Sequence, residues 1–306
     1  MIINISSVWR RVESRHTRFL TRRIIKGQEL LASFVGPGVE HKLYNFIEAH
    51  KKLILSVNAI DFSPGTRDYD ALFRDEKGKA KKLLKKVFDY SAFIEFQDGW
   101  DAYKLCEKSE FNFCPYCHIA GIETHVKGEG KKYRPNLDHY IGKSDYPFLA
   151  LTLGNLIPCC EKCNGPQMKG RIDFLATPHL NPLVDREIIS FSLKPRCNRN
   201  KVSAAMLGLQ LNEGAYKLCL SISGAFQEEA VNSIRTFQLS KRYQVYTGEA
   251  LSLARQVKSQ GRINSLNAKF PGLNIRTEDY ISIATAKDYR NSHGGKMRLD
   301  ILRQYT

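Results

Sequence analysis

The pattern of apolar positions predicts helices over the first hundred residues of the chain. Apolar residues recur at i, i+3 and i+4 over residues 43–57 and again over residues 80–88, which is the spacing of a helix with one buried face. Residues 58–69 lie between these two runs and contain Pro64 and Gly65, so this segment is predicted to be a loop. The N-terminal region is therefore expected to be helical, with its many lysines and arginines on the outer faces.

The pattern changes in the middle of the chain. Residues 101–185 have short apolar runs and many Cys, Gly, Pro and Asn residues, whereas strict alternation over residues 189–193 predicts a half-buried strand. Residues 226–237 have helical spacing, and residues 259–275 are expected to be rich in loops. We therefore predict an α+β protein, a mostly helical chain with an embedded small module. The expected regions are a basic helical N-terminal region (1–100), the central module (101–185) and a mainly helical C-terminal region (186–306).

Composition and charge narrow the class of protein. With 42% hydrophobic residues the 306-residue chain can form a folded core, and no apolar run approaches the roughly 20 residues that span a bilayer. The N-terminus lacks a basic stretch followed by an apolar one, so a cytoplasmic protein is expected. The 47 Lys and Arg residues outnumber the 31 Asp and Glu residues, which gives a formal net charge of +16. A positive excess of this size attracts polyanions, among which nucleic acids are the commonest.

The cysteine spacing indicates a metal site. In a reducing compartment, eight cysteines are better explained by metal binding than by disulfides. Two Cys-x-x-Cys pairs supply the four thiolates that a closed tetrahedral structural zinc site needs, namely Cys114, Cys117, Cys160 and Cys163. Cys159 is an alternative to Cys160, and His118 and His125 are further candidate ligands. The two-residue gap favours Cys160.

The residues between and after these pairs form a second pattern. Asp138 and His139 stand next to each other, Asn155 opens the run Asn-Leu-Ile-Pro-Cys-Cys-Glu-Lys-Cys-Asn, which ends at Asn164, and Lys169 follows. This arrangement resembles the HNH, or ββα-metal, endonucleases. The resemblance covers residues 114–170, about a fifth of the chain.

The resemblance implies a zinc-stapled ββα-metal module that hydrolyses DNA phosphodiester bonds. His139 would be the general base, a neutral imidazole that accepts a proton from the attacking water. Asp138 and Asn164 would be ligands of one catalytic divalent cation, Mg²⁺ or Mn²⁺, because hard cations prefer carboxylate and amide oxygens. Asn164 replaces the last histidine of the family's acronym, in a variant that still binds metal.

Two further residues receive roles from the same resemblance. Asn155 would lie on the second strand of the hairpin, where its amide fixes the loop that carries His139. Lys169 would contact the phosphate backbone of the nucleic acid. Arg134 precedes the hairpin and is, as a basic residue, a further candidate for a contact with that backbone. The zinc ion would be structural and separate from the catalytic cation.

A looser resemblance concerns the biological context. The run Leu-Asp-His-Tyr, then Lys143-Ser144 and Tyr146-Pro147, is similar to the HNH nuclease component of Septu- and retron-type anti-phage defence systems. That similarity implies an effector that acts with an ATPase partner subunit. Two alternatives remain: a non-catalytic zinc-containing protein that binds nucleic acid or serves as a scaffold, and a stand-alone restriction or homing nuclease.

Overall fold

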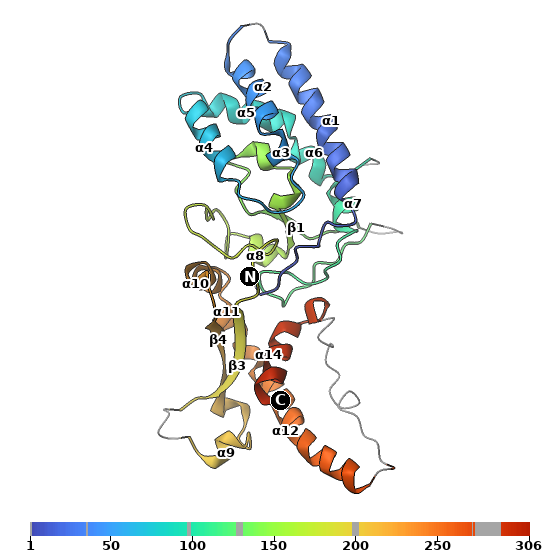
Figure 1. Cartoon of the computed structure of the whole chain (residues 1–306), viewed down its shortest axis with the longest axis vertical. Helices are drawn as coiled ribbons and strands as arrows, with labels where there is room; N and C mark the ends of the chain where they lie inside the picture. The colour runs from blue at the N-terminus through green and yellow to red at the C-terminus, as the bar shows by residue number, and fades with distance from the viewer. Residues whose placement is uncertain are drawn as a thin grey trace.

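A computed structural model shows an elongated molecule, with a helical lobe at one end and a lobe of helices around a β-hairpin at the other (Figure 1). It describes residues 2–34, 36–96, 99–126, 131–197, 202–270, 272 and 289–306. Within these ranges, helices are combined with two small antiparallel sheets of two strands each. No helix in the described ranges is both long enough and apolar enough to cross a membrane.

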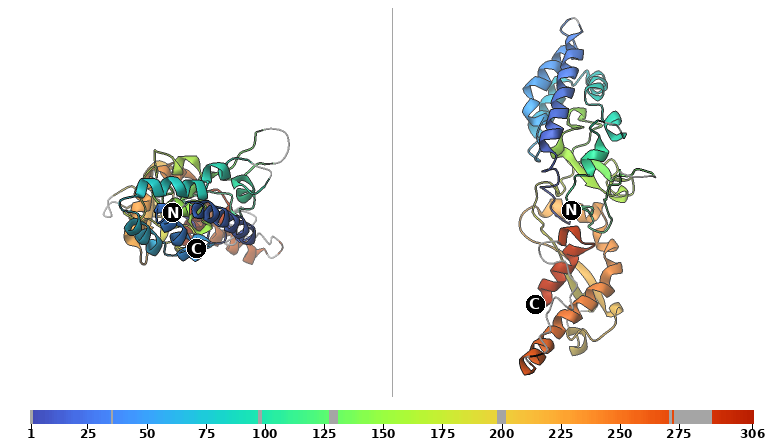
Figure 2. Two further views of the ribbon diagram at one scale, coloured as in Figure 1. Left: turned by 90° about the horizontal axis from the view of Figure 1, so that it is seen from above. Right: turned by 90° about the vertical axis from the view of Figure 1, so that its right-hand side faces the viewer.

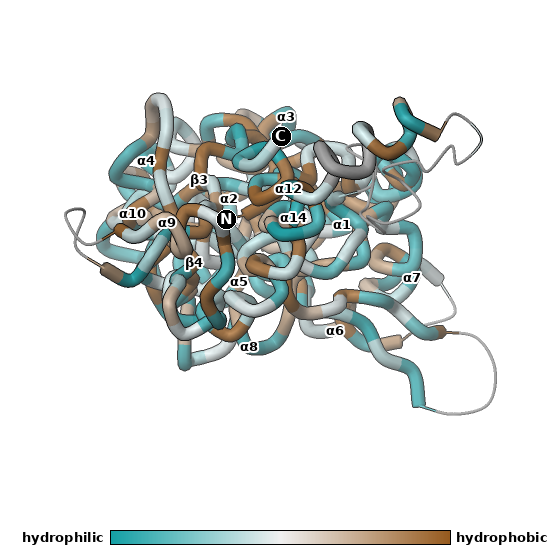
Figure 3. The backbone as a smooth tube through the Cα atoms, turned by 90° about the horizontal axis from the view of Figure 1, so that it is seen from below, coloured by the Kyte–Doolittle hydropathy of each residue, from teal (hydrophilic) through white to brown (hydrophobic). Residues whose placement is uncertain are grey.

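The N-terminal lobe is built from helices that share one hydrophobic core (Figure 2). Its helices are α1 (Glu13–Ala32), α2 (Val39–Ala49), α3 (Lys51–Ile54), α4 (Ser63–Leu72), α5 (Lys77–Val87), α6 (Tyr90–Ile94) and α7 (Ala102–Cys106). The helix expected over residues 43–57 is divided at His50 into α2 and α3, whereas the one expected over residues 80–88 is confirmed as α5. Both hydrophobic and hydrophilic residues occur along these helices (Figure 3), as amphipathic packing requires.

The loop predicted over residues 58–69 is wrong in its second half, because α4 begins at Ser63. Pro64 lies in the first turn of this helix, where an amide hydrogen would have no partner within the helix, so proline is tolerated there. Gly65 is buried, and a Cβ atom added to it would approach a Leu53 side-chain carbon to 3.1 Å. The Pro-Gly pair therefore marks the start of a closely packed helix.

Between the lobes lies the hairpin that carries the adjacent Asp and His residues. Strand β1 (Asn136–His139) pairs with β2 (Leu156–Cys159), and α8 (Glu161–Asn164) follows. The connection contains two short 3₁₀ elements, η1 (Pro147–Leu149) and η2 (Leu153–Asn155). Aromatic side chains bind the outer edges of the hairpin: Trp9 donates to the Leu156 carbonyl at 2.9 Å, and Tyr90 donates to the Leu137 carbonyl at 3.2 Å.

The N-terminal lobe is fixed to this hairpin by a close backbone approach. Gly154 donates to the Ser56 carbonyl, and a Cβ atom at Gly154 would lie 2.2 Å from the carbonyl oxygen of Asn58. Thr152 donates its hydroxyl to the Ile54 carbonyl at 2.8 Å. Only glycine fits between the two backbones at residue 154, so this position fixes how the hairpin sits against the helices.

The C-terminal lobe is centred on a second hairpin, β3 (Ile189–Pro195) with β4 (Tyr216–Ile222). The strand predicted over residues 189–193 is thus confirmed, and the helix predicted over residues 226–237 is α10. The other elements are α9 (Ala204–Leu207), η4 (Glu213–Ala215), α10 (Gln227–Thr236), α11 (Leu239–Arg242), η5 (Gln244–Tyr246), α12 (Thr247–Lys269), η6 (Tyr289–Asn291) and α14 (Gly295–Tyr305). Helix α14 covers the free edge of β3, where Asp300 and Gln304 accept hydrogen bonds from backbone amides of the strand.

The loop-rich stretch expected over residues 259–275 is wrong as far as residue 269, because α12 continues to Lys269. This part of α12 is polar, so it gives little apolar periodicity from which a helix could be inferred. The stretch contains no proline before residue 271, so no residue in it removes a helical hydrogen bond. Residues 271 and 273–275 lie outside the described ranges.

A buried histidine connects α1 to the rest of the molecule. Trp100 donates to Nδ1 of His16 at 3.1 Å, and Nε2 of His16 donates to the Leu151 carbonyl at 2.7 Å. Both bonds suit the neutral ring, since one nitrogen accepts and the other donates. Burial lowers the pKa of His16 to about 4.

This environment predicts a loss of stability in acid. Between pH 6.5 and about pH 4 the unfolded chain binds a proton at residue 16 and the native chain does not. The free energy of unfolding should therefore fall with decreasing pH, by up to about 1.4 kcal/mol per pH unit from this residue. Denaturant unfolding of His16→Gln at several pH values should give a shallower dependence than the parent protein. An identical slope would contradict the assignment; the other buried histidines keep the variant's slope above zero.

Candidate functional site

Four cysteines meet beside the central hairpin. The sulfur atoms of Cys114, Cys117, Cys160 and Cys163 all lie within 4.8 Å of one another, and all four residues are buried and free of disulfides. A zinc ion with Zn–S bonds of about 2.3 Å separates its sulfur ligands by roughly 3.8 Å, so the cluster has the size of a tetrahedral site. These four thiols can therefore hold a zinc ion.

The structure decides between the candidate ligands. Cys160 belongs to the cluster, whereas Cys159 is the last residue of β2 and lies outside it. Successive residues of an extended backbone point to opposite sides, which accounts for this difference. His118 lies elsewhere: its Nε2 donates to the Arg290 carbonyl at 3.1 Å, and its Nδ1 accepts from the Lys296 amide at 3.3 Å. His125 pairs with Tyr133 and is not part of the cluster.

Residues of the C-terminal lobe surround the cluster. Arg242 in α11 donates to Sγ of Cys163 at 3.3 Å, and the Tyr243 hydroxyl donates to the Cys117 carbonyl at 2.7 Å. Hydrogen bonds from the neighbouring thiols, and then the charge of Arg242, lower the pKa of Cys117. A cation beside four thiolates offsets part of the negative charge that a Zn(Cys)₄ centre carries. The cluster thus joins the central hairpin to the C-terminal lobe.

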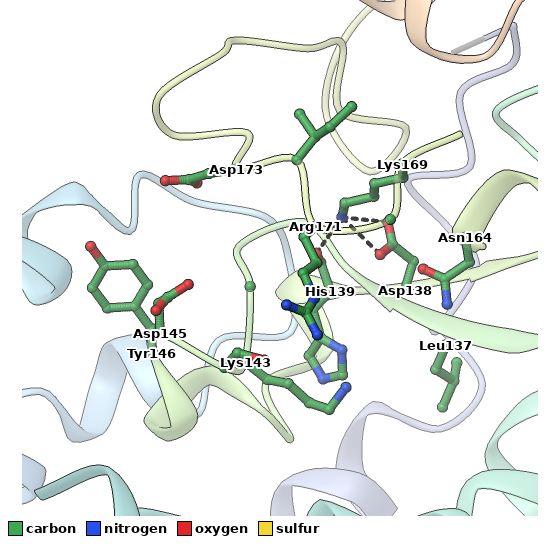
Figure 4. Close-up of a pocket in the computed structure, with 14 residues that line it drawn as sticks. Leu137, Asp138, His139, Lys143, Asp145, Tyr146, Asn164, Lys169, Arg171 and Asp173 are labelled. Atoms are coloured by element: carbon green, nitrogen blue, oxygen red, sulfur yellow. Dashed lines mark hydrogen bonds and ion pairs between the residues drawn. The ribbon is translucent and has the colours of Figure 1, made fainter. Parts of the chain in front are cut away.

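A cavity of about 500 Å³ opens next to this cluster (Figure 4). Four of the site residues expected from the sequence line it, namely Asp138, His139, Asn164 and Lys169. Asp138 and His139 are the last two residues of β1, so the strand ends at the site and both side chains reach one cavity. Asn164 lies at the end of α8, directly after the cluster residue Cys163.

His139 is buried and has a fixed orientation. Its Nε2 lies 2.9 Å from the Ala150 carbonyl oxygen, which can only accept, so Nε2 carries the proton and Nδ1 keeps a lone pair. Burial, and then the positive charge of Lys143, lower the pKa of His139 to about 3. The ring is therefore a neutral base near pH 7.

Asp138 is held by two buried side chains. The Lys169 ammonium lies 2.7 and 2.8 Å from its two carboxylate oxygens and 2.5 Å from the His139 carbonyl. The Tyr116 hydroxyl donates to the carboxylate at 2.5 Å. Burial, and then the charge of Asp138, raise the pKa of Tyr116, so this hydroxyl keeps its proton and donates. Lys169 is buried and directed at Asp138, and its expected contact with phosphate stays a prediction.

Asn155 lies one residue before β2, not on the strand as expected. Its side-chain oxygen accepts from the Ile141 amide at 2.7 Å, and its nitrogen donates to the carbonyls of Ile141 and Leu149. The amide side chain thus extends the strand pairing beyond the end of the ladder. Because Leu149 precedes Ala150, Asn155 positions the carbonyl that orients His139.

Arg134 lies apart from the cavity that contains Asp138 and His139. Its guanidinium donates to the carbonyls of Pro135 and Ile94 and lies over the ring of Tyr103. It lines a different and smaller pocket, near Cys160. Its expected contact with nucleic acid therefore stays a prediction, at a place outside the cavity.

The sequence patterns missed several residues that shape the site. Tyr116 stands between two zinc-ligand candidates, and only the fold shows that it reaches Asp138. Lys143 lines the cavity, and its ammonium lies 4.7 Å from the ring centre of Tyr90, which in turn packs against His139. Arg171 also lines the cavity (Figure 4). The cavity therefore combines three cations, Lys143, Lys169 and Arg171, with three carboxylates, Asp138, Asp145 and Asp173.

The chain is similar to one curated protein, the Septu protein PtuB of Bacillus thuringiensis. The two are 32% identical over 111 residues, which is 34% of this chain and 40% of PtuB. The chain thus spans well under two thirds of the length of this relative. No protein-family model and no solved structure matches the chain.

The cluster predicts different effects for two neighbouring cysteines. Cys160→Ser removes one of four sulfur ligands, so zinc content, about one ion per chain in the parent, should fall steeply and the melting temperature should drop. Cys159→Ser, the matched control, should keep its zinc. Elemental analysis of both purified variants makes the comparison, and the reverse pattern would place the ligand at residue 159.

Proposed function

We propose that this chain is a metal-dependent HNH endonuclease that cleaves DNA, with a zinc ion in the four-cysteine cluster. The observation that carries the proposal is the convergence of Asp138, His139 and Asn164 on one cavity beside that cluster. An alternating pair of residues in mid-strand would point apart, and their position at the end of β1 avoids this.

His139 is proposed to act as general base. Its Nδ1 accepts the proton of a water molecule as that water attacks the phosphorus atom. The bond from phosphorus to the leaving ester oxygen then breaks, and this oxygen takes up a proton. Ala150 fixes the tautomer, and Asn155 fixes Ala150 by binding the preceding carbonyl. A phosphate in the cavity would offset the charge of Lys143 and raise the pKa of His139 towards its usual value.

Asp138 and Asn164 offer a carboxylate and an amide oxygen, a donor set that suits Mg²⁺ or Mn²⁺. A divalent cation bound there would stabilise the negative charge that develops on the phosphate in the transition state. Lys169 and Tyr116 keep the Asp138 carboxylate oriented, because each donates a short hydrogen bond to it. Lys143 and Arg171 would attract the phosphate backbone into the same cavity.

The zinc ion is proposed to be structural. Four thiolates leave no open coordination position for water or substrate. The cluster connects the loop that contains Tyr116 to the start of the helix that ends at Asn164. Because Tyr116 binds Asp138, the cluster helps to fix both proposed ligands of the catalytic cation, Asp138 and Asn164.

The biological context follows from the similarity to PtuB, which supports a role in Septu-type anti-phage defence. We propose that the chain acts there as an effector with an ATPase partner subunit. Co-purification of this chain with the ATPase encoded by a neighbouring gene would support the partnership. If the chain is stable and cleaves DNA on its own, and neither binds such an ATPase nor changes activity with it, a stand-alone nuclease is favoured.

The base assignment predicts the effect of one substitution. His139→Ala should lower the rate of Mg²⁺- or Mn²⁺-dependent plasmid cleavage by at least about 100-fold, the usual contribution of a general base, while zinc content stays the same. His41→Ala, at an exposed position of α2, is the matched control and should keep full activity. Full cleavage by the His139 variant would contradict the assignment, and no cleavage by any version would favour a non-catalytic zinc protein.

A further inference from the structure

A second, separate groove lies on α1. Its cavity of about 550 Å³ is lined by Arg15, Arg18, Phe19, Arg22, Gly99 and Trp100. The three arginines have a spacing of three and four residues, so they follow one face of the helix. No acidic residue lines this groove among the described residues. The groove therefore presents concentrated positive charge beside aromatic rings.

The arginines of the groove have no acidic partners. Within the described ranges, Arg15, Arg18 and Arg22 form no ion pair, whereas Arg11 on the preceding turn is paired with Glu110 at 2.8 Å. All three are exposed. Three unpaired guanidinium groups along about 10 Å of helix repel one another, and an anionic ligand that bridges them would relieve this repulsion.

Aromatic rings orient the cations at this surface. The Arg15 guanidinium lies 4.5 Å from the ring centre of Trp100. Next to it, the Lys104 ammonium donates to the Gly99 carbonyl and lies over Phe96, as does the ammonium of Lys132 at 3.3 Å. These stacked cations have less conformational freedom to lose on binding, so the surface is partly organised for polyanions.

The spacing fits a phosphate backbone. Arg15 and Arg22 are about 10 Å apart along the helix axis, and duplex DNA carries one phosphate per about 3.4 Å on each strand. The three arginines therefore extend far enough along α1 to contact more than one phosphate of the backbone. The two rings that line the groove each lie beneath a guanidinium group, Trp100 beneath Arg15 and Phe19 beneath Arg23. The groove therefore offers guanidinium groups to phosphates more readily than ring faces to bases.

The groove is also close to the proposed catalytic cavity. A row of rings runs from His139 through Tyr90, Phe93 and His16 to Trp100, with centre-to-centre steps of 4.7, 6.4, 5.7 and 6.3 Å. The rings of His139 and Trp100 thus lie nearer to each other than one turn of duplex DNA, about 34–36 Å. One duplex is long enough to reach both sites.

We propose that the α1 groove is a second DNA-binding site, which holds the phosphate backbone of duplex DNA outside the catalytic cavity. The inference rests on the proposed action on DNA, but it does not depend on cleavage. The groove supplies affinity without reading the base sequence, because phosphates carry no direct sequence information.

The test compares two triple variants of equal charge. Arg15→Gln, Arg18→Gln and Arg22→Gln together remove the groove cations, and Lys194→Gln, Lys217→Gln and Lys241→Gln remove three exposed cations of the C-terminal lobe. Both are made in the His139→Ala background, and binding to a 30-base-pair duplex is measured without added Mg²⁺ or Mn²⁺ at several salt concentrations. The groove variant should reduce the slope of log K against log salt by about 2 to 3, and the control should leave it nearly unchanged.

Three results would contradict the proposal that the α1 groove binds DNA. Equal losses in the two variants would show that only net charge matters. An unchanged slope in the groove variant would remove the site and leave the proposed nuclease intact. If the groove substitutions weakened binding to single-stranded DNA of the same sequence but not to the duplex, the assignment to duplex DNA would be contradicted. Cleavage is measured separately, in proteins that keep His139. If the groove substitutions weaken DNA binding but the parent protein never cuts DNA, only the proposed nuclease activity is refuted.

Circular dichroism and the fluorescence of Trp100 serve as folding and proximity controls. Both variants should keep the helical spectrum of the parent protein. With Trp9→Phe introduced into every protein, Trp100 is the only tryptophan of the chain. Its fluorescence should change on addition of duplex to the parent protein and to the control variant, because Trp100 lines the groove. The same change in the groove variant would contradict binding at this place.

Discussion

The four-cysteine cluster is the constraint on which the rest of the structure depends. Strands β1 and β2 have four residues each, and an isolated hairpin of that size is marginally stable at best. The cluster joins the loop at Cys114 to the residue that follows β2, so two segments far apart in sequence are held beside the hairpin. Its surroundings extend this connection to α11 through Arg242 and Tyr243.

The second constraint is the buried charge pair beside the hairpin. Asp138 and Lys169 are both nearly inaccessible to solvent, and a buried carboxylate without a partner would be costly. The Tyr116 hydroxyl donates to the Asp138 carboxylate, and the His139 carbonyl accepts from the Lys169 ammonium. Both groups belong to residues of the site. Such a network contributes less to stability than to a single defined arrangement of the acidic group.

The local part of this structure could be predicted from the sequence. The Cys-x-x-Cys spacing identified the four clustered cysteines and favoured Cys160 over Cys159, because ligand spacing is a local property. Apolar periodicity predicted α5 and β3, whose buried faces repeat regularly. The same reasoning failed for α4, where a Pro-Gly pair starts a helix, and for the polar second half of α12.

The remainder depends on contacts between distant segments. Tyr116 reaches Asp138 across 22 positions, and Trp100 reaches His16 across 84. No periodicity or motif encodes such pairs in a single sequence. The α1 groove was missed for the same reason: basic residues of one helix are ordinary surface until the fold places Trp100 among them. Likewise, the family resemblance assigns Lys169 a phosphate contact, and only the fold shows that its ammonium is buried against Asp138.

We propose that the chain holds two metal sites of different character, a zinc cluster and a cation site at Asp138 and Asn164. Titration of zinc-loaded protein with Mn²⁺, followed by electron paramagnetic resonance, tests it directly. We expect about one weakly bound Mn²⁺ per chain with the zinc retained, and Asp138→Asn should abolish this Mn²⁺ site while zinc content stays the same. Undiminished Mn²⁺ binding by the variant, or displacement of zinc by Mn²⁺ in the parent protein, would contradict the account.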